Sequence, residues 1–99
     1  MFTATTYFSL PHAAKRLPEI AMLFAGAGEV SHDRSRADAL MPFGHLTFRA
    51  VEAGLDVVLV SPDPRALAQG RKMVEHHLRR VVFPLRFEGL AWTSPVALS

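Results

Sequence analysis

The chain has 99 residues, of which 49% are hydrophobic and 20% charged, a composition that fits one globular domain and excludes a disordered chain. It contains no Cys, which excludes a disulfide framework, thiolate metal ligands and a Cys nucleophile. Eleven Lys and Arg against nine Asp and Glu give a net charge of +2, a weaker field than nucleic-acid binders usually carry.

The sequence shows neither a secretory signal nor a membrane span. Its first residues lack the basic and apolar regions of a signal peptide, and no uninterrupted apolar run reaches about eighteen residues. The absence of Cys also fits a reducing compartment. We therefore expect a cytoplasmic protein that has no membrane partner.

The first predicted elements are a strand over residues 2–9 and a helix that follows it. Aromatic and β-branched side chains alternate with a period of two in the first segment, which is typical of a strand with one buried face. We expect Ser9 to cap the helix and Gly26 and Gly28 to end it. Pro18 removes an amide hydrogen bond and should kink or split the helix. The apolar stripe of this helix comprises Ala13, Leu17, Ile20, Ala21 and Phe24.

The middle of the chain predicts a polar segment and a run of three or four strands. Residues 29–38 are polar, and residues 32–35 have the composition of a turn or exposed loop. A short strand over 39–41 ends at Pro42 and Gly44. Residues 45–61 then alternate on both sides of Gly54, which predicts a β-hairpin.

A second helix and a last strand complete the predicted order. Asp63 supplies an N-cap and Pro64 fits the first helical position, so the helix starts there and is stopped by Pro84. Gly70 lies on the buried side, which indicates close packing against a neighbour. In the last strand, residues 85–92, a bulge at Gly89 would bring the apolar side chains to one face.

These elements predict a single α+β domain over residues 1–99. The expected order is β-α-β-β-β-α-β, and a run of strands between two helices indicates a mainly antiparallel sheet. We expect a two-layer sandwich with both helices on one face of that sheet.

Several short motifs along this chain resemble a bacterial domain-of-unknown-function family, number 2218. They are Pro11-His12-Ala13, Pro42-Phe43-Gly44, His77-Leu78 with Arg80 and Phe83, and Trp92. This chain departs from the family at Pro84-Leu85, which stands where the family often has an Arg-acidic pair. Some members are joined to, or lie near, siderophore-interacting flavoproteins, so the resemblance implies an accessory role in iron uptake and a flavoprotein or siderophore-related partner.

No pattern of reactive side chains predicts an enzyme or a metal site. His76 and His77 are neighbours on a helix and point about 100° apart, and no two His have the i, i+4 spacing of a helical metal pair. Ser31-His32-Asp33 is contiguous and cannot adopt the linear relay of a catalytic triad without an unusual backbone. We expect no cofactor and lean against catalysis.

Two surfaces are candidates for binding. Met22 and Leu23 are apolar on the side of the first helix away from its main stripe, so they favour self-association into a homodimer. The second helix carries a basic stripe that is a solvated face or an anion-binding surface. That stripe comprises Arg65, Arg71, Lys72, His76, Arg79 and Arg80.

The leading hypothesis from the sequence is a non-catalytic binding or accessory module, linked to iron–siderophore use through the family resemblance alone. One alternative is an anion or nucleic-acid binder that uses the basic second helix, although nucleic acid is not the partner we expect. The other is a small enzyme whose His and acid groups are gathered by the fold, which a deep pocket lined by His12, His45 or Asp56 would favour.

Overall fold

A computed structural model describes residues 1–10, 12–26, 28–52, 54–81, 92–93 and 96–97. Within these residues the strands are β1 (Phe2–Ser9), β2 (Glu29–His32), β3 (Arg36–Met41), β4 (Gly44–Val51), β5 (Gly54–Ser61) and β6 (Val96–Ala97). The helices are α1 (Ala13–Phe24) and α2 (Pro64–Val81). The strands form one antiparallel sheet in the order β2-β3-β4-β5-β1-β6.

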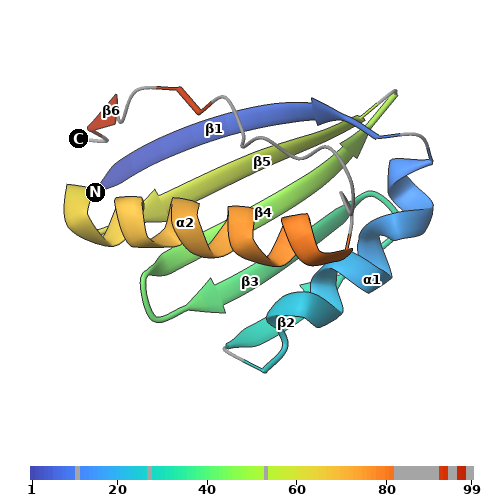
Figure 1. Ribbon diagram of the computed structural model, residues 1–99, viewed down its shortest axis with the longest axis horizontal. Helices are drawn as coiled ribbons and strands as arrows, with labels where there is room; N and C mark the ends of the chain where they lie inside the picture. The colour runs from blue at the N-terminus through green and yellow to red at the C-terminus, as the bar shows by residue number, and fades with distance from the viewer. Residues whose placement is uncertain (11, 27, 53, 82–91, 94–95, 98–99) are drawn as a thin grey trace.

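Both helices lie on the same face of this sheet, as Figure 1 shows. α1 packs against β2, β3 and β4, while α2 packs against β5, β1 and β4. The predicted two-layer α+β architecture is confirmed. The core lies between the layers and is built from inward side chains such as Leu17, Phe24, Phe48, Leu59 and Leu67, each of which is almost completely buried.

The predicted hairpin is confirmed, with β4 and β5 paired from His45↔Val60 to Val51↔Gly54. Gly44, at the start of β4, has φ +146°. A Cβ at this position would also fall on the carbonyl oxygen of Val60. The break after Pro42 therefore needs a residue without a side chain, because both the backbone conformation and the space require it.

The predicted close approach at Gly70 is also confirmed. A Cβ on Gly70 would lie 2.7 Å from Cδ1 of Phe43 and 2.8 Å from Cδ2 of Leu59. Gly70 therefore lets α2 sit directly on the Phe43 side chain and on β5. This contact links the Pro-Phe-Gly motif to the second helix.

Of the three or four strands expected between the helices there are four, and the one missing from the predicted order is β2, which lies in the polar segment 29–38. The Oδ1 atom of Asp33 accepts hydrogen bonds from the amides of Ser35 at 2.9 Å and Arg36 at 3.0 Å. This turn folds the segment into the β2–β3 hairpin. Polar side chains do not prevent the pairing, since the ladder uses only backbone groups and the outward positions of an edge hairpin are solvated.

Two predictions about α1 concerned Pro18 and the N-cap. The helix is not split at Pro18 but runs through it. Ser9 does not cap it either, because the N-cap residue is His12, which has a left-handed backbone with φ 56° and makes no side-chain capping bond. The predicted end of α2 at Pro84, and the predicted last strand over residues 85–92 with its bulge at Gly89, lie outside the described residues apart from Trp92.

Candidate functional site

The face of the sheet opposite the helices, here called the outer face, carries side chains in three rows across the strands. Each row joins residues that are Cα partners on neighbouring strands, so their side chains lie side by side. The first row is Tyr7, Asp56, Arg49 and Arg36; the middle row is Thr5, Val58, Thr47, Asp38 and Ser31; the third row is Thr3, Val60, His45, Leu40 and Glu29. Among the described residues, no helix covers these rows.

An open hollow of about 530 Å³ lies over β1, β5 and β4 on this face. It spans the first two rows, and a volume of this size is within the range of small-molecule sites. The side chains and backbone that line it include Thr5, Tyr7, Thr47, Arg49, Asp56, Val58 and Thr93. It therefore offers an aromatic ring, hydroxyl groups, one cation and one carboxylate within one depression.

Arg49 and Asp56 are the charged residues of this hollow. They are Cα partners on β4 and β5, yet neither forms an ion pair with any residue that the structure describes. Tyr7, the partner of Asp56 on β1, is 49% exposed. The first row thus places a guanidinium group, a carboxylate and an aromatic ring side by side. Neither charged group is paired within the described part of the chain, and the ring is half exposed, so all three can contact a ligand.

Thr93 closes the β1 side of the hollow. Its amide donates to the carbonyl of Thr5 at 2.8 Å, and its Oγ1 accepts from the amide of Thr5 at 2.9 Å. The neighbouring Trp92 donates from Nε1 to Oε1 of Glu75 on α2 at 2.9 Å. The Trp of the family resemblance therefore anchors this segment to α2. Thr93, which no sequence pattern singled out, reaches the site.

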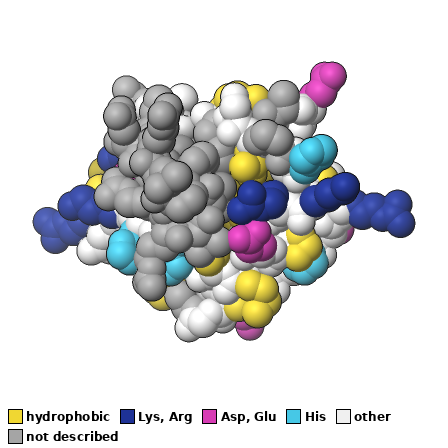
Figure 2. All heavy atoms as spheres, turned by 45° about the vertical axis from the view of Figure 1, so that its right-hand side comes forward, with side chains coloured by type: hydrophobic (Ala, Val, Ile, Leu, Met, Phe, Trp, Pro, Cys, Tyr) yellow, Lys and Arg dark blue, Asp and Glu magenta, His cyan; other side chains and the backbone are white. Residues whose placement is uncertain are grey.

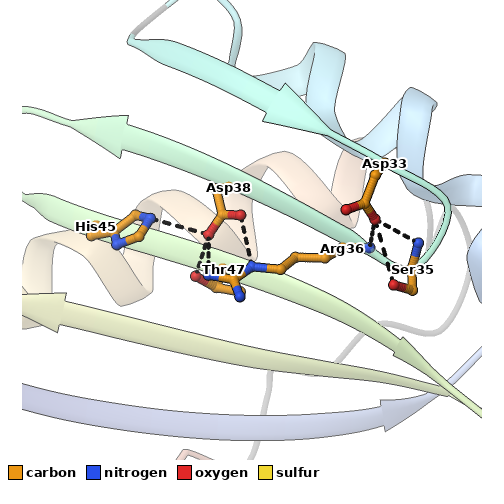
Figure 3. Close-up of polar contacts among 6 residues, drawn as sticks. All are labelled: Asp33, Ser35, Arg36, Asp38, His45 and Thr47. Carbon is orange, nitrogen blue, oxygen red and sulfur yellow. Dashed lines mark hydrogen bonds and ion pairs between the residues drawn. The ribbon is translucent and has the colours of Figure 1, made fainter.

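Beside the hollow, Asp38 is the centre of a polar network, shown in Figure 3. Its carboxylate accepts from Arg36 Nε at 2.7 Å, from the second guanidinium nitrogen at 3.0 Å and from the Thr47 hydroxyl at 2.8 Å. His45 Nε2 lies 3.2 Å from the same carboxylate. The Arg36 hydrogen bonds, followed by that of Thr47, hold the pKa of Asp38 below its usual value.

This network does not resemble a catalytic pair. A carboxylate that three donors already bind is a weak base, so Asp38 is poorly suited to take a proton from a substrate. Its carboxylate instead orders the side chains of Arg36, Thr47 and His45 around it. The network fixes the shape of the outer face next to the hollow.

The other candidate catalytic groups do not meet in one enclosed cavity within the described residues. His45 lines a second, smaller open hollow of about 240 Å³ with Glu29, Ser31 and Asp38, while Asp56 lines the larger one. His12 lies at the start of α1, away from both. In the part of the chain that the structure describes, no three His, Asp or Glu residues are placed to hold a metal ion.

His77 has a packing role between the two helices. Its ring stacks on Phe24 of α1 with centroids 5.0 Å apart, and its Nδ1 lies 2.9 Å from the carbonyl oxygen of Met73. Because that oxygen can only accept, Nδ1 carries the hydrogen. His76 next to it is exposed, and the two rings meet edge to face at 5.7 Å.

The predicted basic surface is only partly assembled. Arg65, Lys72 and His76 are exposed and, at seven- and four-residue spacings, share one side of α2, whereas Arg71 is partly buried and lies off that side. The side chains of Arg79 and Arg80 lie outside those that the structure describes. On the face drawn in Figure 2, Lys and Arg side chains lie at both edges and near the middle, beside acidic, His and apolar ones.

The predicted self-association surface on α1 separates into two environments. Leu23 is partly buried and packs against the core. Met22 is 71% exposed. The two side chains therefore lie in different surroundings, and only Met22 stands fully on the solvent side of the helix, next to the exposed Pro18 one turn earlier.

Comparisons with known proteins place the chain beside proteins of unknown role. A family model described as "Uncharacterized protein conserved in bacteria (DUF2218)" matches residues 5–93. The chain is similar to the NMR structure of PA4090 from Pseudomonas aeruginosa, with 24% identity, a TM-score of 0.75 and coverage of 94% of this chain and 96% of that one. That likeness shows a shared fold. No curated protein matches the chain. Neither described helix is long and apolar enough to cross a membrane.

Proposed function

The chain belongs to the uncharacterised bacterial family DUF2218, and we propose that it is a non-catalytic binding module whose small-molecule ligand lies on the outer face of the sheet. The hollow over β1, β5 and β4 is the single observation that carries this proposal. A cytoplasmic location fits the absence of Cys from the sequence.

The side chains of the hollow define the chemistry of the ligand. The Arg49 guanidinium has no carboxylate partner among the described residues and can bind an oxyanion through two parallel hydrogen bonds. The exposed Tyr7 ring offers a surface for a flat or cyclic group, and Asp56 can accept a hydrogen bond from it. The ligand is therefore an organic anion that carries a ring and at least one donor.

A ferric siderophore is the first probe, because the family resemblance links some members to siderophore-interacting flavoproteins. Such a complex supplies all the oxygen ligands of its own iron, so a protein that binds it needs only cations, rings and hydroxyl groups for its periphery. Arg49, Tyr7 and the Thr side chains are groups of these kinds. The role in iron uptake remains part of the proposal.

The test is an NMR titration of the isotope-labelled protein with one catecholate and one hydroxamate siderophore. Each siderophore carries gallium in place of ferric iron, because gallium causes no paramagnetic broadening. We expect the amide signals of β1, β4 and β5 to shift on binding. In Arg49→Ala the dissociation constant for the siderophore complex should rise by about tenfold or more, because a hydrogen bond to a charged group is lost. Arg65→Ala on α2 is the matched control and should bind as the parent does. Shifts confined to α2, or none with either probe, would contradict the proposal.

Anion binding by α2 is the second candidate, favoured by the exposed stripe of Arg65, Lys72 and His76. The salt dependence of the affinity identifies this candidate, because binding through phosphate contacts to surface cations weakens steeply as the salt concentration rises. Binding of a single-stranded oligonucleotide that falls with salt and is lost in Arg65→Ala/Lys72→Ala would support this candidate. Binding insensitive to that double change would rule it out.

A further inference from the structure

We propose that the outer face also docks a second copy of this chain, face to face, around a two-fold axis that runs parallel to the strands between β4 and β5. This goes beyond the ligand proposal and does not depend on it. The interface would be isologous, with the same three rows contributed by each copy.

The order of the strands places this axis at the centre of the sheet. In β2-β3-β4-β5-β1-β6, three strands lie on each side of the line between β4 and β5. A two-fold rotation about that line lays β4 on β5 of the second copy and β3 on β1. It leaves each row at the same height along the strands, so every row meets the same row of the second copy.

The first row is complementary to itself under this rotation. Arg49 comes to lie opposite Asp56 of the second copy, and Asp56 opposite its Arg49. Farther from the axis, Tyr7 meets Arg36 of the second copy, whose guanidinium plane can stack on the ring while it stays bound to Asp38. The unused charges of each copy are therefore paired by the other.

The remaining rows bring together side chains of compatible kinds. In the middle row Val58 meets Thr47 of the second copy, and in the third row Val60 meets its His45. Rotation about an axis across the strands instead places row one on row three, which sets Arg49 against His45 and Asp56 against Val60. Charge complementarity thus favours the axis parallel to the strands.

The hollow fits the same arrangement. It lies over β1, β5 and β4, while the long Arg49 and Arg36 side chains stand on β4 and β3, the strands that rotate onto β5 and β1. The arginines of one copy would occupy the hollow of the other. The rows cover roughly 500 Å² per copy, judged from strand spacing and rise, which is at the small end of specific interfaces and predicts a weak dimer.

The test uses two charge reversals at the centre of the interface. In Asp56→Arg, positions 49 and 56 both carry cations, and in Arg49→Asp both carry anions. Because position 49 of one copy faces position 56 of the other, two copies of the same variant should repel each other. We expect each dissociation constant to rise by about a hundredfold, since like charges facing each other across an interface are strongly unfavourable. An equimolar mixture of the two variants should recover a one-to-one heterodimer. Sedimentation velocity and circular dichroism would measure assembly and folding.

The parent protein is measured over about 10 µM to 1 mM, the range in which a small interface is populated. Arg65→Asp on α2, with the same change of charge, should dimerise like the parent. If a variant fails to fold, isotope-filtered NMR on the parent must show contacts between the Tyr7 ring of one copy and Arg36 of the other. A parent that stays monomeric, variants that dimerise alone, or assembly abolished by Met22→Lys but not by the charge reversals would each overturn the proposal.

Discussion

Arg36 and Arg49 are Cα partners on neighbouring strands, yet their guanidinium groups have different surroundings. Arg36 binds Asp38, which lies two residues farther along the same strand and so projects from the same face. The positions two residues from Arg49 are Thr47 and Val51, which supply no carboxylate. Arg49 is therefore the arginine whose charge is available to a ligand or a second copy.

Ser61 provides a residue-scale prediction about stability. It is fully buried at the end of β5, and its hydroxyl has no hydrogen-bond partner among the residues that the structure describes. A buried hydroxyl without a partner is destabilising, so Ser61→Ala should raise the free energy of unfolding by about 1 kcal/mol. Urea denaturation of the variant would measure it. Ser9→Ala, at an exposed position, serves as the control and should change little; a clear loss of stability in Ser61→Ala would contradict this account.

At the scale of elements, local chemistry explains which starts and ends could be predicted. α2 begins where Asp63 and Pro64 indicated, and Asp63 Oδ1 accepts the amide of Ala66 at 2.8 Å. The start of α1 was wrong because the left-handed backbone of His12, and not a side-chain cap, begins that helix. A capping residue can be recognised in a sequence, whereas a rare backbone conformation at a non-glycine residue leaves no sign there.

The continuity of α1 through Pro18 leads to an element-scale prediction. α1 continues through Pro18 because its buried stripe, including Leu17 and Ile20, is held against β3 and β4. The missing amide leaves the Ala14 carbonyl without its helical donor, on an exposed side of the helix. Pro18→Ala should restore this bond and stabilise the fold by about 1–2 kcal/mol, after the greater freedom of the unfolded chain is counted.

Thermal and urea unfolding of Pro18→Ala would measure this gain. Ala14→Gly, in the same exposed turn, is the matched comparison and should lose about 1 kcal/mol, because Gly is a poor helix former. If Pro18→Ala were less stable than the parent, the proline ring would have to contribute packing that outweighs the lost hydrogen bond.

At the scale of the whole molecule, the sequence predicted the layers but not the rows of the outer face. Alternation along each strand identifies its two faces, and the turn at Gly54 fixes the β4–β5 register. The β1–β5 register joins segments about fifty residues apart, so Tyr7 could not be placed beside Asp56 in advance. The hollow, Thr93 and the self-complementary charges all depend on that long-range register.

The two proposals meet in one prediction about coupling. If the arginines of a second copy occupy the hollow, ligand and second copy compete, and only the monomer binds ligand. At a protein concentration where about 10% of the chains are monomeric, the apparent dissociation constant for ligand should be about tenfold higher than at high dilution. Saturating ligand should in turn shift the sedimentation profile toward the monomer, because linkage is reciprocal.

Titrations of one gallium siderophore at two protein concentrations, above and below the dimer dissociation constant, would measure this coupling. The same pair of titrations on Asp56→Arg would not isolate it, because Asp56 lines the hollow and its loss changes ligand affinity directly. Dilution of the parent protein changes only the population of the dimer. An apparent affinity that is equal at both concentrations, in a protein that does dimerise, would mean that ligand and second copy use different surfaces.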